Sequence, residues 1–313
     1  MIKSLQKMPV LHDHRLSLMK KPLPTINGVG PSCMRIMHNS GRTVLECLTL
    51  RFPGIAAEAW ISRMKKGKVV DENGTGLEPD TPCRPGGYIY YYRELDKDAP
   101  IPFEESVLYR DDRILVADKP HFLPVVPSGR YLHETLLVRL KQKLALDHLV
   151  PLHRIDRETA GLVIFSHDPG TRGRYASLFR DRQVRKVYEA MAPSAPGVTF
   201  PLELSSRITK GEPFFRMVET DGVPNASTRI SVIETVKDVT RYRLEPLTGR
   251  KHQLRLHMAA LGIPILNDRI YPVTMPLAED DFSRPLKLLA RSVTFPDPFT
   301  GQTIHFESRI RLA

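Results

Sequence analysis

Hydrophobic residues fall at helical spacing in two short runs near the start of the chain, residues 44–50 and 56–64, with the break Phe52-Pro53-Gly54 between them. This spacing predicts two short helices. The segments 67–74 (GKVVDENG) and 86–94 (GGYIYYYRE) predict two short strands, the first of which ends in an Asn73-Gly74 turn. Residues 41–95 are therefore expected to form a small helix-helix-strand domain with a basic rim.

The segments on either side of this domain have no sustained hydrophobic pattern. Residues 1–40 contain the turn sequence NGVGP, and we expect them to form a loosely ordered basic arm. Residues 96–104 hold Pro100 and Pro102 among charged residues, which predicts a linker. The linker leads to a larger domain of residues 105–313, and a chain of 313 residues is long enough for two domains.

The larger domain mixes both periodicities. Residues 106–120 alternate and predict a hairpin, whereas residues 133–146 have the period of an amphipathic helix. A second helix is expected over residues 252–261, stopped by Gly262 and Pro264. Further strands are predicted at 162–166, 187–191, 228–234 and 242–246. Because helices and strands do not alternate regularly, the pattern indicates an α+β fold with a mixed or antiparallel sheet.

Composition adds a strong positive charge to this picture. The chain has 46 Lys+Arg against 35 Asp+Glu, a net charge of +11 and a pI of about 9.6. A hydrophobic content of 41% excludes a wholly disordered chain, and no apolar run reaches the roughly 18 residues of a membrane span. The excess charge indicates an anionic partner, either nucleic acid or an anionic membrane surface.

The start of the chain and its cysteines bear on location. The first residues have no uninterrupted apolar core and no small-residue cleavage site, so we expect no secretory signal and a cytoplasmic protein. Cys33, Cys47 and Cys83 have neither disulfide-framework nor zinc-site spacing, and we expect reduced, structural thiols.

Two polar clusters carry candidate chemistry. His153, Arg154, Asp156, Arg157 and Glu158 precede a strand that the pattern predicts to be buried. On these residues alone, Asp156 has the alternative role of pairing with a neighbouring arginine and capping a turn. The second cluster lies in residues 247–268, where basic and apolar residues are interleaved, so that its cations must lie against a core. Its basic members are Arg250, Lys251, His252, Arg255 and His257.

Three ordered motifs resemble those of the RluA-type pseudouridine synthases. They are residues 153–162 (HRIDRETAGL), Lys186-x-Tyr188 and residues 249–257 (GRKHQLRLH). Lys119-Pro120 and the tail at 288–306 resemble that family's flanking segments. The resemblance covers about residues 105–313.

The resemblance implies that Asp156 is the catalytic aspartate, that Tyr188 stacks on the target uracil and that Arg255 pairs with the aspartate. It also implies that Arg154 fills the gap left by a flipped nucleotide, a role that competes with a structural salt bridge near Asp156. Isomerising uridine needs no redox cofactor, metal or ATP. Attack on the anomeric carbon, attack on carbon 6 and removal of a ribose proton all begin from an ionised Asp156, and the sequence does not choose among them.

Other basic residues are candidates for RNA contacts. Residues 172–186 carry six cations against one acid and lead into Tyr188, which favours phosphate contacts over a merely solvated face. His252 and His257 lack a carboxylate at helical spacing, so we expect neutral, hydrogen-bonded histidines and no metal. The RNA-contact candidates in the larger domain are Arg154, Arg157, Arg180, Arg182, Lys186, Arg250 and His252.

Residues 42–93 resemble, in degenerate form, the S-four RNA-binding domain. Arg63, Lys65 and Lys66 are its candidate RNA contacts, and a packing appendage without RNA contact is the alternative. On this appended domain we expect ribosomal RNA as the substrate, with transfer RNA as an alternative, no membrane partner and a monomer.

Departures from the family's usual forms remove no proposed catalytic group, but they leave the identity of the substrate open. Residues 121–127 replace a glycine-containing segment, and Ala160, Lys251 and Asn267 replace frequent serine, threonine or glycine. The competing functions are an inactive RNA-binding or ribosome-assembly protein, and an N-glycosidase with Glu158 as its second acid.

Overall fold

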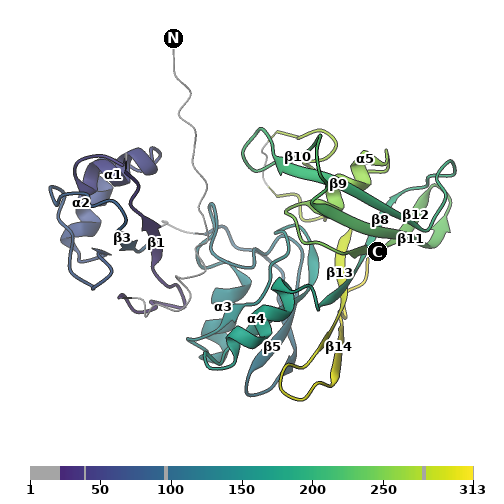
Figure 1. Cartoon of the computed structure of the whole chain (residues 1–313), viewed down its shortest axis with the longest axis horizontal. Coiled ribbons are helices and arrows are strands. Elements are labelled where there is room, and N and C mark those ends of the chain that lie inside the picture. Colours follow the sequence, from purple (N-terminus) through teal and green to yellow (C-terminus); the bar gives the residue numbers. More distant parts are fainter. Residues whose placement is uncertain (1–21, 39, 95–97, 277–279, 313) are drawn as a thin grey trace, which may run out of the picture. The chain divides into compact units, whose positions relative to one another are not determined.

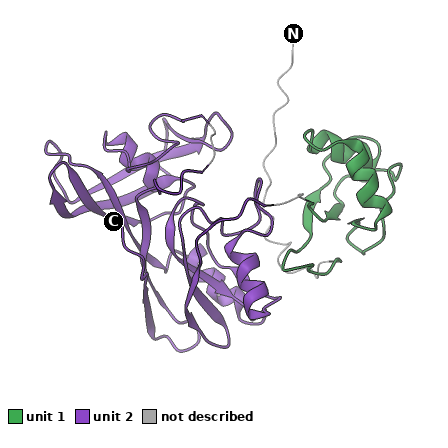
Figure 2. Ribbon diagram, turned by 180° about the vertical axis from the view of Figure 1, so that it is seen from behind, with its two compact units in different colours: residues 1–97 green, residues 98–313 purple. Residues whose placement is uncertain are grey.

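The chain divides into two compact units, residues 1–97 and 98–313 (Figure 2). The computed structural model describes residues 22–38, 40–94, 98–276 and 280–312. Most of the predicted basic arm and part of the predicted linker therefore lie outside the described residues. No helix among the described residues is long and apolar enough to cross a membrane.

The first unit packs two helices on a small antiparallel sheet. Its elements are β1 (Ser32–Arg35), α1 (Val44–Arg51), α2 (Ala57–Lys65), β2 (Val69–Val70) and β3 (Tyr88–Tyr91), with strand order β1-β3-β2. Thr43 caps α1 by accepting a hydrogen bond from the Glu46 N–H, and the Glu46 carboxylate accepts one from the Arg42 N–H. Trp60 is fully buried at the centre of the core. The helices and strands predicted here are confirmed, whereas β1 lies in a segment expected to be loop.

The second unit is built on one mixed sheet of 11 strands (Figure 1). The strands run in the order β10-β9-β11-β12-β8-β13-β7-β5-β4, while β14 pairs with β13 and β6 pairs with β7. All neighbouring strands are antiparallel except β13 and β7, which are parallel. The predicted α+β class with a mixed sheet is confirmed. The strands of the first half are β4 (Ser106–Arg110), β5 (Ile114–Lys119), β6 (Val150–Pro151) and β7 (Ala160–Ser166). Those of the second half are β8 (Arg185–Pro193), β9 (Leu202–Lys210), β10 (Met217–Thr220), β11 (Ala226–Val236), β12 (Val239–Pro246), β13 (Leu288–Pro296) and β14 (Thr303–Glu307).

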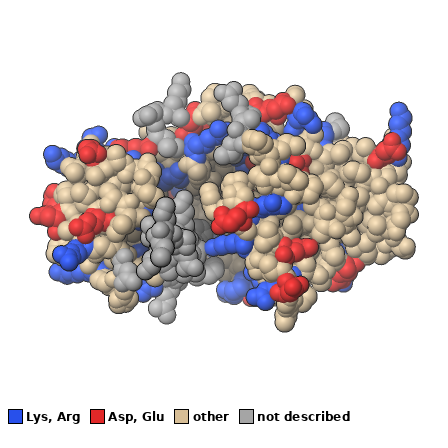
Figure 3. Space-filling model, turned by 90° about the horizontal axis from the view of Figure 1, so that it is seen from above, with Lys and Arg blue, Asp and Glu red and all other residues tan. Residues whose placement is uncertain are grey.

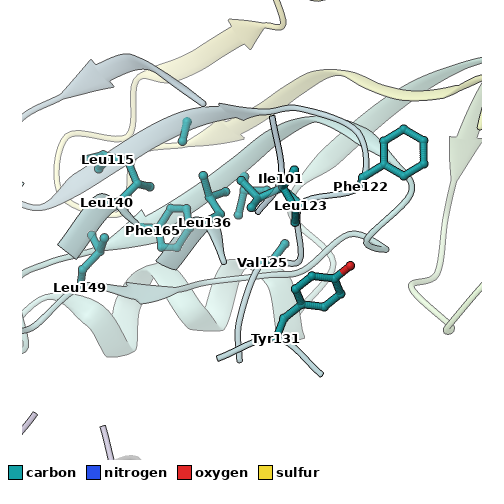
Figure 4. Close-up of a cluster of buried hydrophobic side chains, with 12 residues drawn as sticks. Ile101, Leu115, Phe122, Leu123, Val125, Tyr131, Leu136, Leu140, Leu149 and Phe165 are labelled. Atoms are coloured by element: carbon teal, nitrogen blue, oxygen red, sulfur yellow. The ribbon is translucent and has the colours of Figure 1, made fainter. Parts of the chain in front are cut away.

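Two helices cover opposite faces of the β5–β7 region. Leu136 and Leu140 of α3 (Leu136–Leu144) pack with alternate residues of β5 and β7, including Phe165, in the cluster shown in Figure 4. Leu178 of α4 (Arg172–Arg180) packs on the other face, with the intervening strand residues such as Ile164. Successive side chains of a strand point to opposite faces of the sheet. Because β7 is covered on both faces, its sequence is apolar almost throughout.

The third helix, α5 (Gln253–Ala260), lies over the other half of the sheet. Leu254 and Met258 pack into a cluster with residues of β8, β11, β12 and β13. Leu256 packs instead with Ile208 of β9 and with Tyr271. With α5 buried along most of its length, its polar residues are held in fixed positions.

The parallel contact between β7 and β13 depends on Gly161. Its φ is +108°, a backbone conformation that favours glycine, and a Cβ atom there would lie 2.3 Å from the carbonyl oxygen of Ala290. No backbone adjustment of a few tenths of an ångström would relieve that overlap. Gly161 therefore permits the close approach of the two halves of the sheet, directly after the loop that carries Asp156.

We predict that Gly161→Ala lowers the free energy of unfolding of the second unit by about 3 kcal/mol or more, because it adds both a steric overlap and a strained φ. Chemical unfolding followed by far-UV circular dichroism measures this change. Trp60 is the chain's single tryptophan and lies in the first unit, so its fluorescence provides an internal control. Unchanged stability of the second unit would contradict the close approach.

Candidate active site

The loop that carries Asp156 joins β6 to β7 and is fixed on both sides of that residue. The N–H of Ile164 donates to Nε2 of His153 (3.1 Å), whose ring stacks on Phe179. On the other side, the Glu158 carbonyl oxygen lies 2.7 Å from Nδ1 of His121. Because the loop is anchored through the His153 ring before Asp156 and through the Glu158 carbonyl oxygen after it, the position of the Asp156 carboxylate is set in advance.

Lys119 supplies a third fixed point from inside the core. Its side chain is fully buried, and Nζ donates to the carbonyl oxygens of Pro120 (2.9 Å) and Arg157 (3.0 Å). Burial lowers the pKa of Lys119 to about 7, although the charges of Glu158 and Asp156 favour its protonated form.

A buried ion pair supports the opposite side of Asp156. Arg255 of α5 is 1% exposed, and its Nε and Nη2 each donate to the carboxylate of Asp268 at 2.7 Å. The remaining Nη1 lies 3.4 Å from Oδ2 of Asp156 and 3.8 Å from Oε2 of Glu158. Asp268 thus fixes the guanidinium so that its free edge faces Asp156.

The electrostatics of this arrangement keep Asp156 ionised at neutral pH. Burial by itself raises the pKa of the Asp156 carboxyl, but the His252 ring, which is charged in the acid range where this carboxyl titrates, and the charge and hydrogen bond of Arg255 bring that pKa below its usual value. Burial lowers the pKa of His252 to about 4, so that this ring is neutral at pH 7. Its Nε2 lies 3.9 Å from Oδ1 of Asp156, and its Nδ1 lies 3.0 Å from the Tyr271 hydroxyl.

Tyr188 lies on β8, opposite Leu244 of β12 and Ala290 of β13. Burial raises the pKa of its hydroxyl, and the charge of Asp156 raises it further. The phenol is therefore neutral, and its ring packs on the core cluster beneath α5. The structure brings together Asp156, Tyr188 and Arg255, which the sequence analysis proposed as catalytic residues.

The predicted RNA contacts fall into two groups. Arg154, Arg180, Arg182 and Arg250 are exposed, and so are Lys65 and Lys66 of the first unit, whereas Lys186 is half-buried. Arg180 pairs with Asp181 at 3.0 Å, and Nε of Arg250 donates to the Asn225 carbonyl oxygen at 3.1 Å.

The second group has partners or burial inside the fold. Arg157 donates to both carboxylate oxygens of Asp280 (2.9 and 2.8 Å) and to the Tyr131 hydroxyl, so its guanidinium is used inside the fold. Arg63 is buried against Trp60 and paired with Glu94. His252 is buried beside Asp156 and is not part of an exposed surface. Acidic partners hold Arg157 and Arg63, and the Tyr271 hydroxyl lies 3.0 Å from Nδ1 of His252.

Several residues that build the site had no signal in the sequence pattern. Asp268 and Tyr271 follow α5 at irregular spacing, and Asp280 pairs with Arg157 across 123 positions. The histidine expectation is confirmed in one respect, because His257 is hydrogen-bonded to Ser206 (3.1 Å) and Thr228 (2.9 Å). In the described parts of the chain, no group of three or more His, Cys, Asp or Glu residues is arranged to hold a metal ion.

Comparison with known proteins identifies the family. A family model described as RNA pseudouridylate synthase matches residues 113–260. The dual-specificity RNA pseudouridine synthase RluA of Haemophilus influenzae is 30% identical over 225 residues, which are 65% of this chain and 92% of that protein. The chain belongs to the RNA pseudouridylate synthase family. It is an isomerase of the RluA type.

Two further comparisons agree with this assignment. The human pseudouridylate synthase RPUSD2 is 37% identical over 172 residues, which are 53% of this chain but only 30% of that protein. The solved structure of human RNA pseudouridylate synthase domain containing 1 shares the fold, with a TM-score of 0.56 and 22% identity over 68% of this chain and 86% of that one.

We predict that stability of this pseudouridylate synthase rises with pH through Lys119. Between pH about 7 and 10.5 the unfolded lysine is protonated and the folded one is not, so the unfolded state binds more protons and the free energy of unfolding increases with pH. Relative to Lys119→Met, the wild type should gain about 2 kcal/mol between pH 7 and 9. Denaturant titrations at each pH measure the gain, and the exposed Lys143→Met is the control. A constant difference between wild type and Lys119→Met would contradict a neutral Lys119.

We also predict that Asp268→Asn lowers kcat by about 10–100-fold with a smaller change in KM, because Arg255 loses the carboxylate that aims it. The free energy of unfolding should fall by about 3–5 kcal/mol, as expected when one partner of a buried pair is removed. Steady-state kinetics at a temperature where the variant is folded separate the two effects. Asp281→Asn, an exposed carboxylate bound to Ser283, is the control. Wild-type kcat in Asp268→Asn would show that the pair only stabilises the fold.

Proposed function

We propose that this synthase isomerises specific uridines in structured RNA, with ribosomal RNA as the first candidate substrate and Asp156 as the catalytic group. The observation that carries the proposal is the Asp156 carboxylate, 24% exposed, ionised and 3.4 Å from a buried guanidinium. A partly buried anion beside polyanionic RNA opposes binding, so its presence favours a chemical role. This argues against a protein that only binds RNA.

Three possible first steps use the same group. Attack of Asp156 on the anomeric carbon, its attack on carbon 6 of the ring and its removal of a ribose proton all require the ionised carboxylate. In each case the bond to nitrogen 1 breaks, the uracil turns in place, a bond to carbon 5 forms and the proton on carbon 5 is lost. Arg255 supports the ionised state through the fixed Nη1 atom.

Tyr188 provides the surface on which the uracil stacks. Since its phenol is neutral, it relays a proton by donating its own as it accepts another, and it does not act as a phenolate base. Tyr188 therefore accepts a proton only when it gives up its own.

The target base must leave its stack to reach Asp156, at a cost of a few kcal/mol. Arg154 lies two residues before Asp156, is exposed and has a planar guanidinium that stacks and donates hydrogen bonds. We assign it to the space that the flipped nucleotide leaves. Lys65 and Lys66 of the first unit supply additional phosphate contacts.

We predict that wild-type enzyme releases tritium from RNA labelled at carbon 5 of uridine. Asp156→Asn should retain RNA affinity within about twofold and lose at least about a thousandfold in release rate, since no group replaces the carboxylate. Unmodified ribosomal and transfer RNA are compared in parallel, because the Haemophilus influenzae relative is named as a dual-specificity enzyme. Asp112→Asn, an exposed aspartate, is the control.

The outcomes separate the competing functions. Tritium release from one RNA class establishes both the isomerisation and its substrate. Free uracil in place of pseudouridine would establish an N-glycosidase, and tight binding without release would establish an RNA-binding protein. Turnover in Asp156→Asn equal to that of the wild type would overturn the assigned mechanism.

A further inference from the structure

Lys251 lies close enough to Asp156 for their charges to interact, and it has no role in the proposed reaction. It immediately precedes the buried His252 and helix α5, is exposed itself, and donates from Nζ to the Phe215 carbonyl oxygen at 2.8 Å. Partial burial lowers its pKa, the charge of Asp156 favours its protonated form, and Arg255, Arg154 and Lys210 oppose that form. These interactions place Lys251 among three other cations and close to the Asp156 carboxylate.

Lys210 reaches the same region from β9. Side chains on one face of a strand alternate, so Ser206, Ile208 and Lys210 point the same way. Ser206 bonds His257 of α5 at 3.1 Å, and Ile208 packs with Leu256 of α5. Lys210 therefore projects on the α5 side of β9, at the end of the strand, where it is exposed.

Arg154 completes a set of cations drawn from three segments: the Asp156 loop, the end of β9 and the start of α5. In the described part of the chain, no carboxylate lies within ion-pair distance of Arg154, Lys210 or Lys251. Arg255 is held by Asp268, so Asp156 does not have to neutralise it alone. Cations that converge in excess of their counterions repel one another, and this cost is recovered when an anion binds.

We propose that Lys251 and Lys210, beside Arg154, form a phosphate-binding rim that holds the RNA backbone on either side of the flipped uridine. This inference rests on the proposed function, because it places the phosphates of the same substrate. Extrusion of one nucleotide leaves its flanking phosphates at the entrance to the site. Each lysine that neutralises one phosphate releases condensed counterions, so the rim contributes to affinity in a salt-dependent way.

Binding and kinetic measurements with full-length enzyme and its substrate RNA test the rim. Lys251→Gln and Lys210→Gln should each raise KM by about 3–10-fold at 0.15 M salt, and each should reduce the slope of log affinity against log salt by about one. Lys251→Arg should restore the slope, since it keeps the charge. Lys143→Gln removes an exposed lysine of α3 and is the matched control, with an unchanged slope.

Two results would overturn the rim. An unchanged salt slope in both variants shows that neither lysine binds phosphate. A fall in kcat at unchanged KM in Lys251→Gln, with a silent Lys210→Gln, shows that Lys251 only anchors the turn at Phe215. Absence of tritium release by the wild type would show that the proposed function fails. The salt slopes of RNA binding test the rim separately, because they are measured whether or not turnover occurs.

Discussion

The need to neutralise a buried guanidinium governs the site. Arg255 is 1% exposed and cannot lose its charge, so the fold must supply a fixed counterion. Asp268, itself 1% exposed in its side chain, supplies it through two bonds of 2.7 Å and also accepts the N–H groups of Ile270 and Tyr271. Asp156 receives only the third nitrogen, at a longer distance, and stays accessible. Asp268 thus neutralises and orients Arg255, whereas the Asp156 carboxylate stays accessible.

This division depends on the arrangement of the sheet. Asp156 and Arg255 are separated by 99 positions along the chain. They lie close together because the loop that carries Asp156 is followed by β7, and β7 pairs with β13 at Gly161. The loop is then fixed by Lys119, His121 and His153, none of which is close to Arg255 in sequence. The geometry around Asp156 and Arg255 therefore forms only when both halves of the sheet are assembled.

The sequence pattern predicted most helices and strands of the second unit because their apolar faces repeat regularly. It missed α4 because cations and Gly173 break the apolar repeat, leaving Tyr175 and Leu178 as its buried residues. It also did not predict the strands β6, β9, β10, β13 and β14. The helix α3 begins three residues later than predicted, since Thr135 is its cap. Asp156, Tyr188 and Arg255 lie in dense motifs that the sequence displays. Asp268 lies in none, because an ion pair between a helix and the loop after it has no periodic signature.

Charge alone did not show which cations face RNA. The face in Figure 3 shows Lys and Arg side chains interspersed with acidic and uncharged ones, so the net charge of +11 does not by itself mark a binding surface. Burial and partners distinguish the roles. Arg157 and Arg255 each have a bidentate carboxylate, and Lys119 has two carbonyl oxygens, so these residues build the site from within. Arg154 and Lys210 are exposed and have no carboxylate within ion-pair distance in the described part of the chain. A basic residue of this fold is therefore available to a phosphate only where the protein has not supplied its counterion, and that condition is met next to Asp156.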